Sequence, residues 1–354
     1  SQRDVYMAMI DDLDAAMETL YTFASAGDGI LMRDFDISSF KGDSRLWVSF
    51  ANTLKLRMAI RMSGVEPEAR RIAEEAVRDM ATYGLIDANA ENLSFSSDSR
   101  QNPFYTQATS TSWQDLRSNA SIVMYMNAYE DPRRASYFSK SGYDGIYVGV
   151  RAGIQNVTPT DYATYSYPLF AEKDPVPVMY ASESWFLRAE GALLGWTMGD
   201  TAENLYNTGV KTSLELWGNG SSYETYIASE TAPALSYADP RNKHNVSDFG
   251  TAVSVKWADD GNEMERIITQ KWIANHMIGH EAWADVRRTG YPRLLQVVNN
   301  LSGGMWGNVD SSKGMRRLHY PQSEYDNNRE NVLRGVELLG GSDLHGTDVW
   351  WAKK

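Results

Sequence analysis

"SRLWVSFANTLKLRMAIRM", residues 44–62, carries the pattern that decides the fold class. Its apolar residues recur every four positions, as on one face of a helix: Leu46, Phe50, Leu54, Met58 and Met62. Ser44 stands at the start of this run, and its hydroxyl is of the type that caps a helix N-terminus. The stretch is therefore predicted to be an amphipathic helix, capped by Ser44, that buries one face against a neighbour.

A second helix is predicted directly after the first, so that the two form a pair. Pro67 opens the segment "PEARRIAEEAVRDMATYG", and Gly84 ends it. The pair spans about the length of one tetratricopeptide unit, which predicts a helical repeat. Residues 179–217 show a similar pair, with small residues at helical spacing that allow close packing.

Two further helices extend this pattern along the chain. Residues 3–22 place Val5, Met9, Leu13, Met17 and Leu20 on one face, and residues 262–288 are predicted to form one long charged helix. Another short helix is predicted from Leu116 to Tyr129, before Pro132. Strict apolar alternation is scarce, and the best strand candidates are residues 145–150 and 252–257. The expected fold class is therefore mainly α.

The composition excludes several classes of protein. The 354 residues carry a formal charge of −12, which disfavours binding to nucleic acid or to anionic lipid. Cysteine is absent, so these residues hold no disulfide, thiolate nucleophile or thiolate metal site. No stretch approaches the roughly 20 apolar residues that span a bilayer. A neutral or cationic ligand is the expectation from charge alone.

A pair of histidines raises the question of a metal site. On a single helix, His276 and His280 would lie about 40° apart, which is suitable ligand spacing. Glu281 follows the second histidine and points about 140° away from His276, unlike the His-Glu-x-x-His arrangement of zinc peptidases. The helical projection places His276 with apolar residues, and we expect packing rather than metal binding. No metal and no cofactor are predicted.

Other catalytic motifs find no support. The chain holds 46 Asp and Glu, and sequence cannot show which of them face each other, so paired-carboxylate hydrolysis stays open as an alternative. Glycine-rich stretches such as "GGSD" lack the lysine of a phosphate-binding loop, and no G-x-S-x-G is present.

Eight segments taken together, in this order, resemble the SusD/RagB family of outer-membrane nutrient-binding lipoproteins, its SusD-like branch in particular. They are "LWVSFANTLKLRMAIRMSG", "EDPRRASYF", "YDGIYVGV", "PVMYASESWFLRAEGALLGW", "LYNTGVKTSLELWG", "ITQKWIANHMIGHEAWADVRRTGYPRL", "RRLHYPQSEYDNNRENV" and "LGGSDLHGTDVWW". Each segment is weak alone, and their shared order is what identifies the family. In such a scaffold, Trp272 and Trp283 are expected to pack.

The resemblance implies a tetratricopeptide-like helical scaffold with a long irregular ligand-binding part. It also implies that the protein is not an enzyme. We assign residues 1–84, 179–217 and 262–292 to the scaffold of a single SusD-like domain. The irregular part is then 85–178, 218–261 and 293–354. The family's anchor cysteine and the first part of its helical domain are expected to precede Ser1. The implied partners are an oligosaccharide, a SusC-like TonB-dependent transporter and the outer membrane, reached through an N-terminal lipid anchor.

Ligand-binding residues are predicted from composition rather than from a family motif. Aromatic residues make up 12% of the chain, and many stand in Gly-, Ser- and Asn-rich stretches. A sugar ring offers a face of C–H groups to an aromatic ring, and its hydroxyls take hydrogen bonds from polar side chains. The candidates combine both kinds of residue: Trp113, Tyr105, Tyr143, Tyr147, Arg100, Asn102, Asp144 and Trp306.

Packing in the core or within a loop is the alternative role for each of these candidates. At the level of function, a receptor for peptides or another nutrient is the alternative to glycan binding, because tetratricopeptide-like grooves also bind peptides. A helical-fold glycoside hydrolase is the second alternative.

Overall fold

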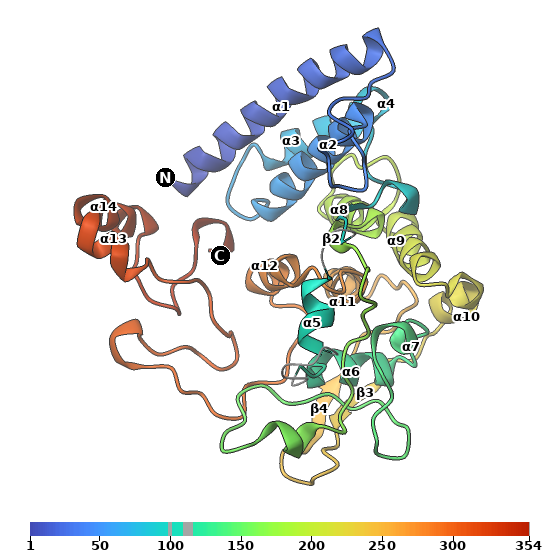
Figure 1. Ribbon diagram of the computed structural model, residues 1–354, viewed down its shortest axis with the longest axis vertical. Coiled ribbons are helices and arrows are strands. Elements are labelled where there is room, and N and C mark those ends of the chain that lie inside the picture. Colours follow the sequence, from blue (N-terminus) through green and yellow to red (C-terminus); the bar gives the residue numbers. More distant parts are fainter. Residues whose placement is uncertain (98–100, 109–115, 354) are drawn as a thin grey trace.

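The computed structural model describes residues 1–97, 101–108 and 116–353, and the part described is mainly helical. Figure 1 shows the arrangement of its helices, which have these bounds: α1 Gln2–Ala26, α2 Ser44–Arg61, α3 Ala69–Arg78, α4 Met80–Tyr83, α5 Pro103–Ala108, α6 Ala120–Ala128, α7 Arg134–Tyr137, α8 Ala181–Leu193, α9 Ala202–Leu216, α10 Tyr223–Ile227, α11 Glu263–Ala274, α12 Gly279–Thr289, α13 Gln322–Asn327 and α14 Arg329–Leu339. The expected fold class is confirmed.

The described strands form two small antiparallel pairs: β1 (Leu93–Phe95) with β2 (Val176–Met179), and β3 (Ala234–Tyr237) with β4 (Val246–Thr251). Both strand predictions from sequence were wrong. Residues 252–257 follow β4 as irregular chain, and in residues 145–150 only Val150 makes a bridge, to Asn119.

The main core lies between α2, α3, α8, α9 and α11. Helices α8 and α9 approach closely because Gly209 on α9 faces the ring of Phe186 on α8. A Cβ at that position would lie 3.0 Å from two ring carbons. The small residue thus sets how near these helices can pack.

Helix α2 forms where residues 44–62 predicted it, but its cap and its burial differ. Asp43, not Ser44, is the N-cap, because its carboxylate accepts hydrogen bonds from the backbone N–H groups of Arg45 and Leu46. Ala51, Leu56 and Ile60 are buried in addition to Met58 and Met62, so α2 is enclosed on more than one face.

Helix α1 buries a different face from the predicted one. Val5 is 51% exposed and Met9 is 50% exposed, whereas Ile10, Met17 and Ala24 are buried. The buried residues recur every seven positions, which is a narrow line along one side of the helix. One long contact with α2 therefore covers α1, and most of its surface faces solvent.

The helix predicted over residues 262–288 is two helices, α11 and α12. The chain turns between them at Met277, whose φ is +73°. This break leaves the last carbonyls of α11 without helical partners, and the hydroxyl of Tyr137 donates to one of them, the carbonyl of Ile273, at 3.0 Å. A buried tyrosine distant in sequence therefore supports the break.

The C-terminal segment contacts two helices that are far apart in sequence, α12 and α1. Trp283 on α12 donates its indole N–H to the carbonyl of Met315 at 2.9 Å, and the Arg287 guanidinium lies 3.6 Å from the centre of the Trp283 ring. The backbone N–H of Trp350 donates to the side chain of Gln2, and the ring of Trp350 packs edge-on against Tyr6. Trp283 thus packs as expected, although it remains half-buried.

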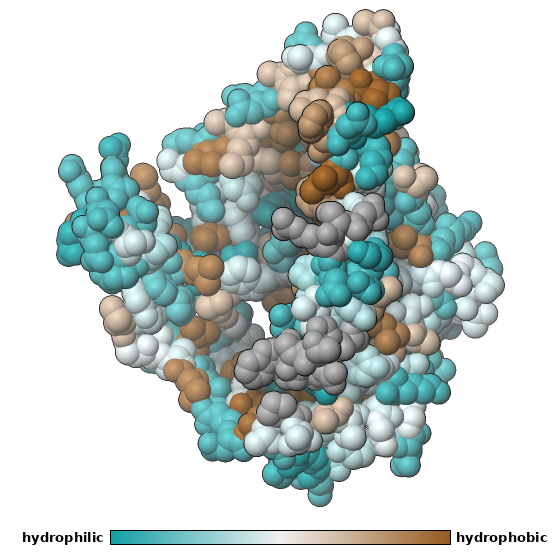
Figure 2. Space-filling model, in the orientation of Figure 1, coloured by the Kyte–Doolittle hydropathy of each residue, from teal (hydrophilic) through white to brown (hydrophobic). Residues whose placement is uncertain are grey.

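Residues 293–354 were expected to be irregular, but two helices lie within them, α13 and α14. Figure 1 shows this pair at the edge of the molecule, and Figure 2 shows that the surface there is mostly hydrophilic. Apolar side chains are exposed in the connection from α1 to α2, where the most exposed are Met32, Phe35 and Ile37. In the part of the chain that is described, no helix is long and apolar enough to cross a membrane.

Candidate functional site

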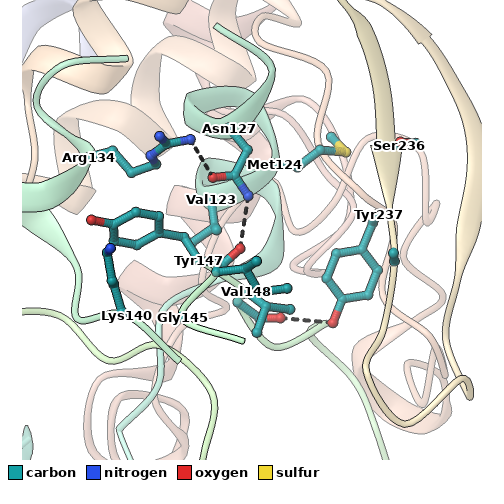
Figure 3. A pocket seen from close by; sticks show the side chains of 13 residues that line it. Val123, Met124, Asn127, Arg134, Lys140, Gly145, Tyr147, Val148, Ser236 and Tyr237 are labelled. Atoms are coloured by element: carbon teal, nitrogen blue, oxygen red, sulfur yellow. Dashed lines mark hydrogen bonds between the residues drawn. The ribbon is translucent and has the colours of Figure 1, made fainter. Parts of the chain in front are cut away.

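A pocket of about 500 Å³ opens between α6, the loop that follows α7, and β3 (Figure 3). It is lined on one side by α6 and on the other by residues 145–149, and β3 contributes Ser236 and Tyr237. We call it the α6–β3 pocket. Its walls mix aliphatic, aromatic and hydrogen-bonding side chains, which is the character of a small-ligand site.

Hydrogen bonds between segments distant in sequence hold the walls of the pocket. Asn127 on α6 donates to the carbonyl of Tyr147 at 2.9 Å and accepts from Arg134 at 3.0 Å. On the opposite side, the hydroxyl of Tyr237 donates to the carbonyl of Gly149 at 2.8 Å. The loop is therefore fixed at two points before any ligand arrives.

Gly149 explains why the loop can lie so close to α6. A Cβ at this position would meet the backbone of Asn119 at 2.7 Å, at the start of the helix. Glycine is therefore required for this close approach of two backbones. The same contact carries the bridge between Val150 and Asn119.

The charged groups of the pocket are all cationic. Arg134 and Lys140 line it, and among its described lining residues there is no carboxylate. The guanidinium of Arg134 lies 4.8 Å from the centre of the Tyr147 ring, in a cation–π contact. Lys140, the second cation of the lining, is exposed.

A second cavity, of about 660 Å³, is lined by residues around Trp257. Most of its charged side chains pair with each other or with their surroundings. Lys256 contacts Glu230 at 2.5 Å, and Asp260 contacts Arg266 at 3.0 Å. The indole of Trp257 donates to Asp259 at 3.0 Å. Because most of its charged groups already have partners, this cavity is the weaker candidate.

Of the predicted ligand residues, only Tyr147 lines the α6–β3 pocket. Tyr143 precedes the pocket and packs edge-on against Tyr165, with ring centroids 5.5 Å apart. Asp144 is exposed at the turn of the same loop, with φ +50°. Tyr147 thus lies in the lining, whereas the neighbouring Tyr143 and Asp144 lie outside it.

Asn102 and Tyr105 lie at α5, away from the residues that line the pocket. Asn102 is buried, and its carbonyl oxygen accepts from the backbone N–H groups of Phe104 and Tyr105. Its amide donates to the carbonyl of Asp174 at 2.9 Å. Asn102 thus caps α5 and ties it to a neighbouring loop, and we leave it out of the proposed site. Trp113 and Arg100 lie outside the described residues.

Trp306 lies in a short 3-10 helix (Gly304–Trp306) of the C-terminal segment. Its ring stacks on His319 with centroids 3.4 Å apart, and His319 contacts His345 through ring nitrogens 2.6 Å apart. One face of Trp306 is therefore occupied by protein. The structure does not bring it to the α6–β3 pocket.

The histidine pair of residues 276 and 280 does not converge. His276 lies in the break between α11 and α12, where it is buried and stacked on Tyr137, while the side chain of His280 is 69% exposed. Within the described residues, no cluster of three or more His, Asp or Glu side chains could hold a metal.

The sequence reasoning missed the pocket's other polar residues, Asn127, Arg134, Lys140, Ser236 and Tyr237. Arg134 and Lys140 stand within or beside segments that were quoted for the resemblance, but nothing in their spacing indicates a shared cavity. Ser236 and Tyr237 come from β3, about a hundred positions later in the chain, and no strand was predicted there. Their convergence is a product of tertiary structure.

A helical scaffold with a loop-built pocket, and no carboxylate among its described lining residues, has the features of a ligand-binding protein. Two carboxylates would be needed there for glycoside hydrolysis of the usual kind. The chain matches the SusD-like family, described as "Susd and RagB outer membrane lipoprotein", over residues 1–352. The chain belongs to this family.

Solved structures agree with this assignment. A chitin-binding SusD homologue from Flavobacterium johnsoniae is 39% identical, with a TM-score of 0.92, and the match covers 100% of this chain and 73% of that one. A SusD homologue from Bacteroides uniformis is 41% identical, with a TM-score of 0.92 and the same coverage. A SusD-like protein from Bacteroides thetaiotaomicron is 40% identical, with a TM-score of 0.88, covering 100% and 74%. No curated protein matches the chain.

Proteins of this family bind ligands and are not enzymes, and they are lipoproteins of the outer membrane. The protein is accordingly a binding protein that belongs at the outer membrane through a lipid anchor. The hydrolase alternative is thereby set aside.

Proposed function

We propose that the protein binds oligosaccharides at the cell surface and passes them to a SusC-like TonB-dependent transporter in the outer membrane. The observation that carries the binding role is the likeness, over the whole of this chain, to a chitin-binding SusD homologue. The family's place in the outer membrane supports the second part of the proposal, transfer to a transporter.

The α6–β3 pocket is the proposed glycan site. Tyr147 supplies an aromatic edge and a hydroxyl, while Ser236, Lys140 and Arg134 supply hydrogen-bond donors. Aliphatic contacts come from Val123 and Met124 on α6. This combination suits the alternating C–H faces and hydroxyl edges of sugars.

The proposed division of labour keeps the residue ranges assigned above. Helices in 1–84, 179–217 and 262–292 would form the scaffold, and the remaining ranges would bind ligand. In support of this, every lining residue of the pocket falls within 85–178 or 218–261. Trp113 and Arg100 belong to residues 85–178 and remain candidates from the sequence.

Calorimetry with purified protein and a panel of oligosaccharides and peptides tests the proposal. We expect saturable binding of at least one glycan, and we expect Tyr147→Ala to weaken it about tenfold, because the ring contributes both contact area and a polar edge. Tyr21→Ala is the matched control, since Tyr21 is an exposed tyrosine on α1. Thermal melting verifies that both variants are folded.

Peptide binding without any glycan binding would overturn the proposal in favour of the peptide-receptor alternative. Equal loss of glycan affinity in both tyrosine variants would instead remove the α6–β3 pocket as the site. For the transfer step, crosslinking in intact outer membranes should capture a TonB-dependent transporter, identified by mass spectrometry. Failure to capture one would contradict that step alone.

A further inference from the structure

We infer that the α6–β3 pocket selects glycans that carry an anionic substituent, a carboxylate or a sulfate. This inference rests on the proposed function, because it takes the pocket to be the glycan site. It departs from the expectation drawn from the net charge of −12, which favoured neutral or cationic ligands.

The first argument is the local charge of the pocket. Arg134 and Lys140 both line it, and no ion pair within the described residues involves either side chain. Most cations elsewhere in the core are paired, as Arg133 is with Asp131 at 2.6 Å. Asp144, directly before the lining residue Gly145, is exposed and does not itself line the pocket. Although the protein is acidic overall, this pocket is therefore lined by two cations that form no ion pair within the described residues.

The second argument is the way in which Arg134 is held. Its guanidinium donates to Asn127 and rests beside the ring of Tyr147, and Asn127 is itself fixed by its bond to the carbonyl of Tyr147. A guanidinium has five N–H donors, of which this arrangement uses one. Figure 3 shows Arg134 and Tyr147 on the same side of the cavity. The remaining donors match the two oxygens of a carboxylate or sulfate, and their orientation is set in advance.

The third argument concerns the free energy of removing water from the two cations when a neutral ligand binds. A sugar that fills the pocket removes water from Arg134 and from the approach to Lys140. Neutral hydroxyls replace that hydration less well than an anion does, because hydrogen bonds between ionised partners are stronger. The same two cations therefore favour an anionic sugar and oppose its neutral counterpart.

Calorimetry on the full chain with three size-matched probes tests this selectivity: neutral chito-oligosaccharides, oligogalacturonates, which carry carboxylates, and heparin-derived oligosaccharides, which carry sulfates. We expect one anionic class to bind at least about tenfold more tightly than the neutral probe. Raising the salt concentration to about 0.3 M should weaken that binding. The two anionic arms show which substituent the pocket takes.

Charge-removing variants link the selectivity to the pocket. Lys140→Gln should weaken anionic binding about threefold to tenfold and neutral binding by a smaller factor, and because Lys140 is exposed the variant is expected to fold. Arg134→Gln should weaken anionic binding more than Lys140→Gln does. Lys313→Gln, an exposed lysine of the C-terminal segment, is the control.

Binding of the neutral probe that equals or exceeds anionic binding would overturn the inference and leave the proposed function standing. Anionic binding that is unaffected by either pocket variant would overturn it as well. The absence of binding to every glycan would overturn the proposed function itself.

Discussion

His276 is buried among aromatic rings in the break between α11 and α12. Its ring lies flat on Tyr137, with centroids 4.0 Å apart and planes 8° apart, and Trp217 and Phe138 pack edge-on around it. Burial lowers the pKa of His276 to about 3, because the surroundings cannot solvate an imidazolium. A neutral stacked ring is the role that its apolar neighbours predicted.

This lowered pKa has a consequence for stability. Above pH 6.5 the histidine is neutral in both the folded and the unfolded protein, so its stabilising contribution is fully present. As the pH falls below 6.5, the unfolded chain binds a proton that the folded protein does not, and stability is lost down to about pH 3.

The wild type should therefore lose about 2 kcal/mol more stability between pH 7 and pH 5 than His276→Phe, which keeps the stacked ring but cannot titrate. Denaturant unfolding at the two pH values measures this difference. Parallel pH dependence in the two proteins would mean that His276 is protonated in the folded state.

Residue identity alone did not show which of the candidate residues line the α6–β3 pocket. Tyr147 and Asn102 were both predicted to bind ligand. Tyr147 lines the pocket, whereas Asn102 caps helix α5. Trp306 has one face covered by His319. Side-chain type indicates what a residue can do, but burial and partners decide what it does, and both depend on contacts far along the chain.

At the scale of elements, buried charges join the central helices. Arg57 on α2 makes two hydrogen bonds to Glu183 on α8, at 2.8 and 2.7 Å. Lys271 on α11 approaches Glu183 at 3.9 Å and contacts Asp285 on α12 at 2.9 Å. Four helices that are separate in sequence therefore share one chain of ion pairs.

Glu183→Gln should destabilise the protein by about 3–5 kcal/mol, because Arg57 and Lys271 would stay buried without their shared carboxylate. Glu230→Gln, at an exposed pair with Lys256, is the matched control and should change stability by about 1 kcal/mol or less. Denaturant unfolding at neutral pH compares the two. Similar small losses would show that the buried network contributes little.

The helices that sequence predicted best have one regular period and clear ends. Residues 44–62 and 179–217 are of this kind, and helices form there. The division of residues 262–288 was missed because the turn depends on the conformation of Met277, a residue type that also suits helix interiors. Helix α14 was missed although Gly340 follows its last residue. A glycine at this position, here in the left-handed conformation, is a recognisable sequence signal for the end of a helix.

At the scale of the whole molecule, the C-terminal residues pack against the first helix. The C-terminal Trp350 contacts Gln2 and Tyr6 of α1, and Trp351 lies against the guanidinium of Arg287 on α12.

The fold class could be predicted because helical periodicity is local. The pocket could not, because α6, residues 140–149 and β3 meet only through tertiary packing, and β3 gave no signal in the sequence.

Hydrogen–deuterium exchange with and without a saturating oligosaccharide tests the central claim, that the α6–β3 pocket is the glycan site, most directly. The account predicts slower exchange of backbone amides in residues 140–149 and 236–238 when the glycan is bound, with α13 and α14 unchanged. Protection around Trp306 or Trp257, with no change in residues 140–149, would contradict it.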